Sequence, residues 1–540
     1  MSRPALAAVV LAATVALVAP AATATAAHAA PSPKHGGSPP TTTVPTPPAP
    51  VWGACDIPRL VREGAQCALL TVPLDYSHPH GKKIQLAISR VLHKTPDSQA
   101  QGPMLVNPGG PGGSGLIYAI FGDFVPNGAG DSYDWIGFDP RGVGESVPAL
   151  SCDTHYNDPV RPDYRTVTRS QQKVWLAKAA GYADDCAHSA AAELLDHITT
   201  VDSAKDMESI RLALGASRLS LYGFSYGTYL GQVYATLFPS TVHRMVLDGN
   251  VDPRGVWYGD NLEQDKAFQI TIRRWFAWVA QYDSVFHLGD TARKVEQAYN
   301  RAQNDLVGHP AGGQIGPAEW NDIFFDPGYY VYGWVEDAQA FSDWVTKHDP
   351  AGIIDLYSGN IGDDNGYAIY NAVQCTDAKW PPSWQTWKHD AYRINRFAPF
   401  ATWANTWFNA PCLTWPAKAH KPVKVNGSRA PGILLVNETL DAATPYEGAL
   451  EVRSRFPKSV LIEGVDGTTH AGSLSGVACT DDTIASYLVD GTLPARKAGR
   501  RSDLQCPPVP APVPEAALSR VAAKSGSSLA LRERLAPAVR

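Results

Sequence analysis

The pentapeptide Gly223-Phe224-Ser225-Tyr226-Gly227 constrains the fold of this chain more than any other feature of the sequence. It lies between an apolar run, residues 219–222, and a run of helical character, residues 228–234. In a G-x-S-x-G turn a strand reverses sharply into a helix, so the serine is strained and its neighbours must be small. The pattern predicts a nucleophile elbow with Ser225 Oγ above a sheet, at the N-terminus of a helix. Alone it is a modest signal, because the chain has 46 glycines.

Short apolar segments alternate with helical stretches along most of the chain from Val51 onward. This alternation predicts an α/β-hydrolase fold, in which helices cover both faces of a mainly parallel, twisted sheet. A polar or glycine-rich motif begins where each segment ends, and catalytic groups gather at the carboxyl ends of such strands. The predicted strands are residues 103–106, 135–138, 219–222, 245–247, 433–436 and 460–462.

The alternation stops between Asp248 and about Arg429, where twelve of the fifteen tryptophans lie. The helical spacing of this block predicts a large helical cap inserted into the α/β core. Most of its aromatic side chains are expected to form the core of the cap, while a few line a substrate pocket. The predicted organisation is a first part of the core at 51–252, the cap at 253–429, a second part of the core at 430–506, and a Pro/Ala-rich tail at 507–540 with a short helix near 529–535.

The first residues have the composition of an export signal. Arg3 precedes an Ala/Val/Leu-rich stretch, and small residues end at Ala27-His28-Ala29, a pattern that suits signal peptidase. We therefore predict a signal peptide at 1–29 and a secreted, extracellular protein. Residues 30–50 are rich in Pro, Thr and Ser and can bury little apolar surface, which predicts a linker or pro-segment.

The eight cysteines are an even number, which favours disulfides in an exported protein. Eight cysteines allow about a hundred pairings, and the simplest of them joins sequence neighbours. A metal site is the weaker alternative, since the sequence has neither C-x-x-C nor H-E-x-x-H spacing. The pairing of neighbours gives Cys55–Cys67, Cys152–Cys186, Cys375–Cys412 and Cys479–Cys506.

Charge and hydropathy argue against two classes of partner. The net charge is only −6, and no basic patch with interleaved aromatic residues is present, so nucleic-acid binding is not expected. The N-terminal apolar run is too short and too rich in alanine for a membrane span, and no later segment reaches the roughly 20 apolar residues required. We expect a monomer that binds neither nucleic acid nor membrane.

A glycine-rich segment, Asn107-Pro108-Gly109-Gly110-Pro111-Gly112-Gly113-Ser114-Gly115, follows the strand that ends at Val106. Consecutive glycines let backbone N–H groups approach a ligand, as an oxyanion hole requires. A flexible loop or a phosphate cradle is the alternative, although a Walker loop would need a lysine that is absent here. With the elbow downstream, we predict the N–H groups of Gly110 and Tyr226 as oxyanion donors.

A serine triad on this fold takes its members in the order Ser, Asp or Glu, His. His470 is the last histidine of the chain, and it follows the strand at 460–462. Two acids, Glu438 and Asp441, follow the strand at 433–436. Asp441 lies further from the strand end, where the loop can bend toward His470, so we predict the triad Ser225, Asp441 and His470 and a structural role for Glu438.

Asp139 and Arg141 lie in a turn-rich loop after the strand at 135–138. These two residues could form a catalytic ion pair. We favour a structural pair that braces the loop under the active site.

In these motifs the chain resembles the secreted tripeptidyl-aminopeptidase-like α/β-hydrolases of actinobacteria. These enzymes are relatives of the prolyl iminopeptidases and carry a TAP-like C-terminal region. The prolyl iminopeptidases usually begin the oxyanion motif with histidine, where Asn107 stands here, and this departure fits the secreted branch. The resemblance rests on the segments 107–115, 139–142, 223–227, 247–249, 371–377, 440–446 and 469–470.

The resemblance implies a serine exopeptidase that cuts short peptides, often tripeptides, from free N-termini and needs no metal or cofactor. Such specificity needs a carboxylate in the cap to pair with the substrate ammonium group. The candidates are Asp377, Glu336 and Asp337. A secreted carboxylesterase that acts on small acyl esters is the alternative, because it would use the same triad under a different cap.

Overall fold

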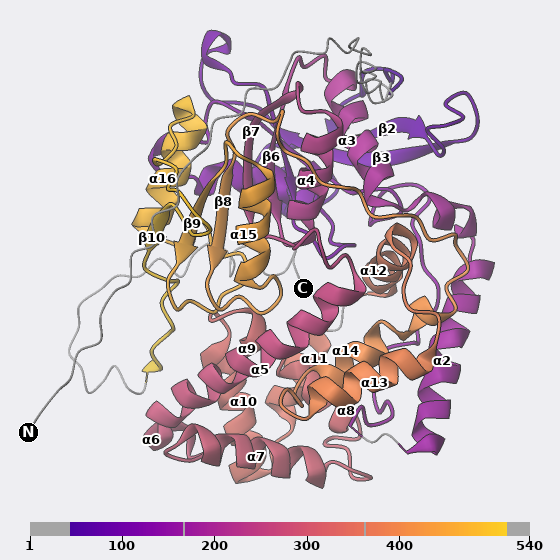
Figure 1. Ribbon diagram of the computed structural model, residues 1–540, viewed down its shortest axis with the longest axis vertical. Coiled ribbons are helices and arrows are strands. Elements are labelled where there is room, and N and C mark those ends of the chain that lie inside the picture. Colours follow the sequence, from indigo (N-terminus) through magenta and orange to yellow (C-terminus); the bar gives the residue numbers. More distant parts are fainter. Residues whose placement is uncertain (1–43, 166–167, 361–362, 516–540) are drawn as a thin grey trace, which may run out of the picture. The chain divides into compact units, whose positions relative to one another are not determined.

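The computed structural model describes residues 44–165, 168–360 and 363–515 (Figure 1). The predicted signal peptide at 1–29, residues 30–43 of the predicted linker and the helix expected near 529–535 lie outside the described residues. Four disulfides are present, and they are the four that the pairing of sequence neighbours predicts.

Within the described residues one sheet of ten strands runs in the order β1-β2-β3-β5-β4-β6-β7-β8-β9-β10. The strands β1 to β3 are antiparallel, β3 also pairs antiparallel with β5, and every pair from β5 to β10 is parallel. The predicted fold class is confirmed, and each of the six predicted strands overlaps an observed one. The strands are β1 Gly53–Ala54, β2 Gln66–Pro73, β3 Lys83–Val91, β4 Pro103–Asn107, β5 Asp134–Phe138, β6 Leu219–Phe224, β7 Val242–Asp248, β8 Leu434–Glu438, β9 Val460–Gly464 and β10 Leu504–Cys506.

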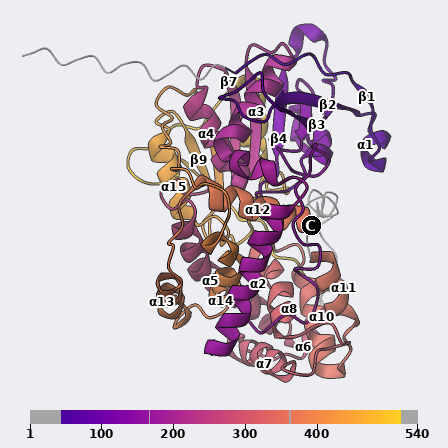
Figure 2. The same ribbon diagram turned by 90° about the vertical axis from the view of Figure 1, so that its right-hand side faces the viewer.

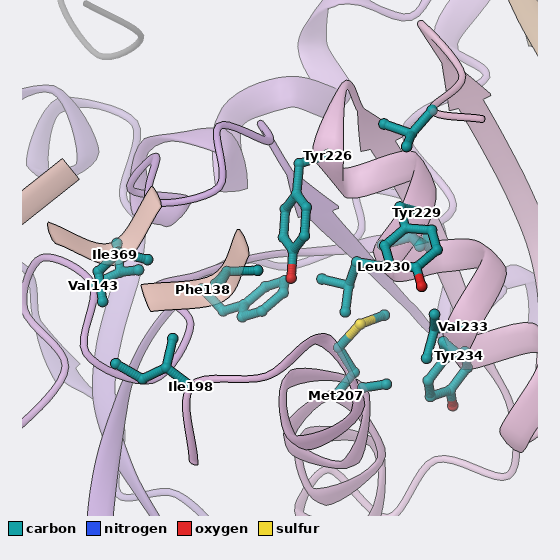
Figure 3. Packing of buried hydrophobic residues seen from close by; sticks show 14 of the residues in the cluster. Phe138, Val143, Ile198, Met207, Tyr226, Tyr229, Leu230, Val233, Tyr234 and Ile369 are labelled. Atoms are coloured by element: carbon teal, nitrogen blue, oxygen red, sulfur yellow. The ribbon is translucent and has the colours of Figure 1, made fainter. Parts of the chain in front are cut away.

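Helices cover both faces of the sheet because its strands are apolar on both sides. Along β4, for example, Leu105 belongs to the cluster on one face and Val106 to the cluster on the other, as the two-residue period of a strand requires. The helices α3 (Thr200–Ala213), α4 (Tyr226–Leu237) and α15 (Tyr446–Arg455) contribute to the first cluster, and Figure 3 shows Met207 and Leu230 within it. The helices α1 (Pro58–Arg62) and α16 (Ala478–Asp490) contribute to the second.

A cap of helices follows β7 and has an aromatic core of its own (Figure 1). Trp275, Trp320, Phe324 and Phe341 are fully buried in this core, as expected for aromatic residues that form the core of the cap. Other tryptophans of the predicted cap, among them Trp257, Trp380 and Trp387, instead belong to the cluster on the first face of the sheet. The cap helices are α5 Tyr258–Gln281, α6 Asp283–Phe286, α7 Ala292–Asp305, α8 Pro317–Ile323, α9 Asp326–Tyr329, α10 Trp334–Lys347, α11 Ala351–Asn360, α12 Asp364–Asp377, α13 Trp384–Asn395 and α14 Thr402–Phe408.

The helix α2 (Arg169–His188) lies in the range predicted as α/β core, yet it packs against the cap (Figure 2). Its Trp175 stacks on Trp407 of α14 with ring centroids 5.7 Å apart. The disulfide Cys152–Cys186 ties the last turn of α2 back to the loop that follows β5. Two separate insertions into the core therefore build the cap, and only the second, tryptophan-rich one was predicted.

Candidate active site

The elbow after β6 has the strained geometry that its sequence predicts. Ser225 has φ 54° and ψ −123°, and it is the residue that joins β6 to α4. A Cβ at Gly223 would lie 2.5 Å from the carbonyl oxygen of Gly227, and one at Gly227 would lie 2.7 Å from the carbonyl oxygen of Asn107. Both flanking positions therefore accept only glycine. The serine holds its unfavourable conformation because the surrounding backbone leaves no room for another.

The imidazole of His470 is held by Asp441. Nδ1 lies 2.8 Å from Asp441 Oδ2. The carboxylate also accepts hydrogen bonds from the backbone N–H groups of Ala443 and Thr444, at 2.9 and 3.0 Å, and from Thr444 Oγ1 at 2.8 Å. These donors fix the direction of the carboxylate. An acid facing Nδ1 keeps the proton on that nitrogen and leaves Nε2 as the basic one.

The remaining ring nitrogen of His470, Nε2, is buried. Among the described residues, His470 Nε2 has no hydrogen-bond partner. The imidazole packs on Gly249, where a Cβ would lie 2.8 Å from the ring, and the preceding Asp248 accepts a 3.0 Å hydrogen bond from Ser225 N–H through its carbonyl oxygen. The structure thus joins Asp441 and His470 by a hydrogen bond, and the segment Asp248-Gly249 lies between the imidazole and the backbone of Ser225, at the carboxyl ends of the central strands.

The glycine-rich loop after β4 lies directly against the elbow. A Cβ at Gly109 would lie 2.8 Å from Ser225 Cβ and 3.1 Å from Tyr226 N. Gly110 and Tyr226, whose N–H groups are the predicted oxyanion donors, both line the cavity that contains Ser225. Tyr226 is the first residue of α4, where a backbone N–H has no acceptor within the helix. This placement favours an oxyanion hole over a phosphate cradle.

Asp139 braces the glycine-rich loop, but it does so without Arg141. Its Oδ1 accepts hydrogen bonds from Ser114 Oγ at 2.7 Å and from Gly115 N–H at 2.8 Å. Arg141 instead forms a fully buried ion pair with Asp206 of α3, with Nη2 and Oδ1 2.7 Å apart. The predicted pair between Asp139 and Arg141 is therefore wrong. The two side chains leave the loop in different directions, and each is satisfied by a different element.

Glu438, the other acid considered for the triad, does not contact the imidazole. Its Oε2 accepts a 2.7 Å hydrogen bond from Thr469 N–H, and its Oε1 accepts one of 2.7 Å from Val509 N–H. Burial raises the pKa of this carboxyl to about 8.

A cavity of about 650 Å³ opens over Ser225. Its walls come from the core, from the cap and from the segment before α2, so the cap encloses the serine as expected. Aromatic side chains supply much of the apolar wall, and these include Trp257, Phe268, Phe325, Tyr329, Tyr357, Tyr370 and Phe408. A space of this size is typical of sites that enclose a small ligand.

None of the three acids predicted to bind a substrate ammonium group lines this cavity. Asp377 is buried beside α3, where it accepts a 2.8 Å hydrogen bond from Thr200 N–H, and burial raises its pKa to about 6. Glu336 is exposed in the first turn of α10, and its neighbour Asp337 is buried inside the cap. Their positions give no support to a role in substrate binding.

Five other acids line the cavity, and four of them have a basic partner. The ion pairs are Asp252–Arg254, Glu263–Lys266, Asp322–Arg161 and Glu447–Arg500.

The fifth acid, Asp260, has no ion-pair or hydrogen-bond partner for its buried Oδ2 among the described residues. Burial, and then the nearby charge of Asp252, hold the pKa of Asp260 well above its usual range. Sequence reasoning missed this residue, although its place shortly after the end of β7 was a usable signal.

The described residues contain no group of three or more His, Cys, Asp or Glu side chains placed to hold a metal ion. The same part of the chain has no helix that is both long enough and apolar enough to cross a membrane.

Two family models match the chain. One described as alpha/beta hydrolase fold matches residues 102–361, and one described as TAP-like protein matches residues 398–506. The chain is 40% identical to a tripeptidyl aminopeptidase of Streptomyces lividans over 482 residues, which cover 86% of this chain and 87% of that protein.

Two mycobacterial proteins are more distant relatives. The serine protease Hip1 of Mycobacterium tuberculosis is 32% identical and covers 80% of this chain and 86% of its own length. A carboxylesterase B of the same species is 30% identical and covers 82% and 86%.

Proposed function

Because the chain belongs to the α/β-hydrolase family of the tripeptidyl aminopeptidases, we propose that it is a secreted serine exopeptidase that releases tripeptides from free N-termini. One observation carries the proposal. A single cavity is lined by Ser225, by both expected oxyanion donors and by an acid, Asp260, that lacks a cation. The four disulfides support a role in an oxidising compartment outside the cell.

The proposed chemistry is acyl transfer. Ser225 Oγ attacks the carbonyl carbon of the scissile peptide bond while His470 Nε2 takes its proton. The backbone N–H groups of Gly110 and Tyr226 bind the negative oxygen of the tetrahedral intermediate. His470 then gives the proton to the leaving amine, and the acyl group stays on the serine. Water, activated by the same nitrogen, hydrolyses the ester and frees both the peptide and Ser225.

Asp441 orients the imidazole throughout this cycle. Its carboxylate already accepts two backbone N–H bonds and one hydroxyl bond, so it cannot turn away from Nδ1 without losing them. When Nε2 gains the proton, the adjacent carboxylate stabilises the imidazolium that forms.

We propose Asp260 as the group that binds the substrate ammonium. An ionised carboxyl that is buried without a cation is unfavourable, and a bound ammonium supplies the missing charge. The other four acids of the cavity are already neutralised by Arg or Lys, so they attract a second cation less strongly. An enzyme that recognises the free N-terminus at a fixed distance from Ser225 cuts a peptide of defined length. Three extended residues span about 10 Å.

A carboxylesterase is the second candidate. A relative that carries this name is 30% identical, and the apolar aromatic wall of the cavity would also accept an acyl chain. The triad and the oxyanion hole would act in the same way on an ester, so only the treatment of the substrate N-terminus separates the two functions.

Three substrates separate the candidates: a free tripeptide anilide, its N-acetylated twin and a phenyl ester of a short acid. An exopeptidase cleaves the free anilide far faster than the blocked one, whereas an esterase cleaves the phenyl ester and neither anilide well. The Ser225→Ala variant serves as the control, and it should lose turnover of all three substrates while keeping the melting temperature of the wild type. Equal cleavage of the free and blocked anilides contradicts the aminopeptidase proposal.

A further inference from the structure

The residues after the last strand form a proline-rich strap, defined here as residues 507–515, which has the sequence PPVPAPVPE. Five of its nine residues are proline, and residues 507–514 have no regular secondary structure. Segments of this composition favour a stiff, extended conformation that loses little entropy when it is fixed. The disulfide Cys479–Cys506 and the pairing of β10 with β9 anchor its first end on the sheet.

The strap joins the α/β core to the cap. Val509 is 7% exposed and lies in the hydrophobic core of the cap, although its N–H donates to Glu438 at the end of β8. Further along, the carbonyl oxygen of Pro512 accepts a 3.0 Å hydrogen bond from Trp278 Nε1 of α5. In Figure 1 the chain after β10 runs from the sheet toward the cap helices. One short segment thus contacts both parts of the molecule that enclose the cavity.

Glu438 connects the strap to the loop that carries the catalytic histidine. One carboxylate oxygen accepts the N–H of Val509, and the other accepts the N–H of Thr469, the residue directly before His470. A Cβ at Gly467 would lie 2.2 Å from Glu438 Oε2, so the histidine loop folds tightly over the carboxylate. After the histidine, a Cβ at Gly472 would lie 2.8 Å from Val509 Cγ2. The histidine loop therefore contacts Glu438 before His470 and the strap after it.

We propose that the strap positions the imidazole of His470 through Glu438. Glu438 is a positioning residue, because it contacts neither the imidazole nor the cavity and acts only on the backbone of the histidine loop. The inference rests on the proposed triad. If the strap shifts, Glu438 and the backbone of Thr469 shift with it. Nε2 of His470 then moves relative to Ser225 Oγ. A displacement of about 1 Å in an active site is enough to lower the rate about a hundredfold.

The chemistry of Glu438 favours this role over simple stabilisation. In the described residues no basic side chain pairs with it, although it is only 5% exposed. A buried acid without a cation is a poor stabiliser. A side chain that accepts one N–H on each of two oxygens does, however, fix two backbone segments at a set distance. An amide cannot replace it, because its NH₂ group would face one of the two donors.

The strap provides a matched pair of variants. Val509→Pro removes the N–H that Glu438 accepts, whereas Ala511→Pro removes an N–H that makes no hydrogen bond among the described residues. Both positions already precede a proline, so both are confined to the extended region. Val509→Ala keeps the N–H and removes the two γ-methyl groups, which separates the hydrogen bond from the packing.

We expect Val509→Pro to lower kcat about tenfold on the anilide and on the phenyl ester, with KM within twofold of the wild type. The rate at which a serine-directed phosphonate labels Ser225 should fall by the same factor. Ala511→Pro should stay within twofold in all three measurements, and Val509→Ala, which keeps the N–H, should lose less than Val509→Pro. If Val509→Pro does not fold, Glu438→Gln is judged by the same criteria, with the melting temperature recorded for each variant.

Two outcomes overturn the inference: a kcat for Val509→Pro within twofold of the wild type, or equal losses in Val509→Pro and Ala511→Pro. Failure of the proposed triad has a different signature, because the wild-type protein itself would then not be labelled at Ser225.

Discussion

The replacement Asp260→Asn tests how the cavity recognises a substrate. Among the described residues, it removes the one cavity-lining acid that forms no ion pair, and it keeps the size of the side chain. Removing one partner of a buried, hydrogen-bonded charge pair costs about 2 kcal/mol at the low end of the measured range. This value corresponds to about 30-fold in kcat/KM. The loss should fall on the free tripeptide anilide and spare its N-acetylated twin, which has no ammonium group.

The assay is the ratio of kcat/KM for the free anilide to that for the blocked anilide. Glu263→Gln is the matched control, because Glu263 lies in the same helix and lines the same cavity, but it is exposed and paired with Lys266. Exposed pairs contribute about 0–1 kcal/mol, so the ratio should stay within about fivefold of the wild type. An unchanged ratio in Asp260→Asn, or an equal loss in Glu263→Gln, refutes the assignment of the ammonium site.

Asp260→Asn should lower activity but raise the stability of the folded protein at high pH, because the pKa of Asp260 is raised in the folded state. The pKa of Asp260 is raised in the folded protein, so folding takes up a proton, and stability falls as pH rises from the unfolded pKa, about 3.9, through the folded one. Asparagine removes this dependence. Asp260→Asn should therefore melt at a higher temperature than the wild type at pH 8, and the difference should shrink toward pH 4. A lower melting temperature at pH 8 contradicts this reasoning.

Three further predictions concern the triad, the oxyanion loop and a disulfide. Asp441→Asn presents an NH₂ group to the imidazole or to the backbone donors, and kcat on the phenyl ester should fall about 10⁴-fold; a loss below tenfold contradicts the role of this acid. Gly109→Ala places a Cβ 2.6 Å from the Phe224 carbonyl oxygen, and kcat should fall about 100-fold at nearly constant KM; a kcat within threefold of the wild type shows that the loop is not the oxyanion hole. The disulfide Cys375–Cys412 closes a loop with a sequence separation of 37, so replacing both cysteines by serine should lower the free energy of unfolding by about 4 kcal/mol in urea titrations; an unchanged midpoint contradicts this.

The members of the proposed triad could be selected from the sequence because each of them follows a strand end. Each triad residue lies within a few positions of an apolar strand, and parallel strands bring their carboxyl ends together whatever the length of the chain between them. Ser225 and His470 are 245 positions apart, yet their strands, β6 and β9, belong to the same sheet, with only β7 and β8 between them. The glycine positions could also be predicted, since a turn with no room for a Cβ requires glycine in the sequence.

The partners of the charged side chains could not be predicted in the same way. Asp377 turns toward Thr200, and Arg141 reaches Asp206 rather than Asp139, two positions before it. Lys266, Arg254, Arg161 and Arg500 each pair with one of the other acids of the cavity, and none of them forms an ion pair with Asp260. Such pairings depend on packing between elements far apart in the sequence, and neither periodicity nor spacing encodes them. The same reason explains why the contribution of α2 to the cap was missed.

These differences have a common physical basis. In the mechanism that we propose, the chemistry depends on local geometry at the sheet, while the selection of substrate depends on a cap acid, Asp260, that forms no ion pair among the described residues. The histidine loop belongs to both systems. Its backbone is held by the core through Glu438 and by the cap through a 2.7 Å hydrogen bond from His470 N–H to the Tyr329 carbonyl oxygen. A cap that shifts on a poorly matched substrate would therefore also displace the catalytic base. Binding of the correct N-terminus and reactivity of Ser225 are then coupled through the backbone of a single residue.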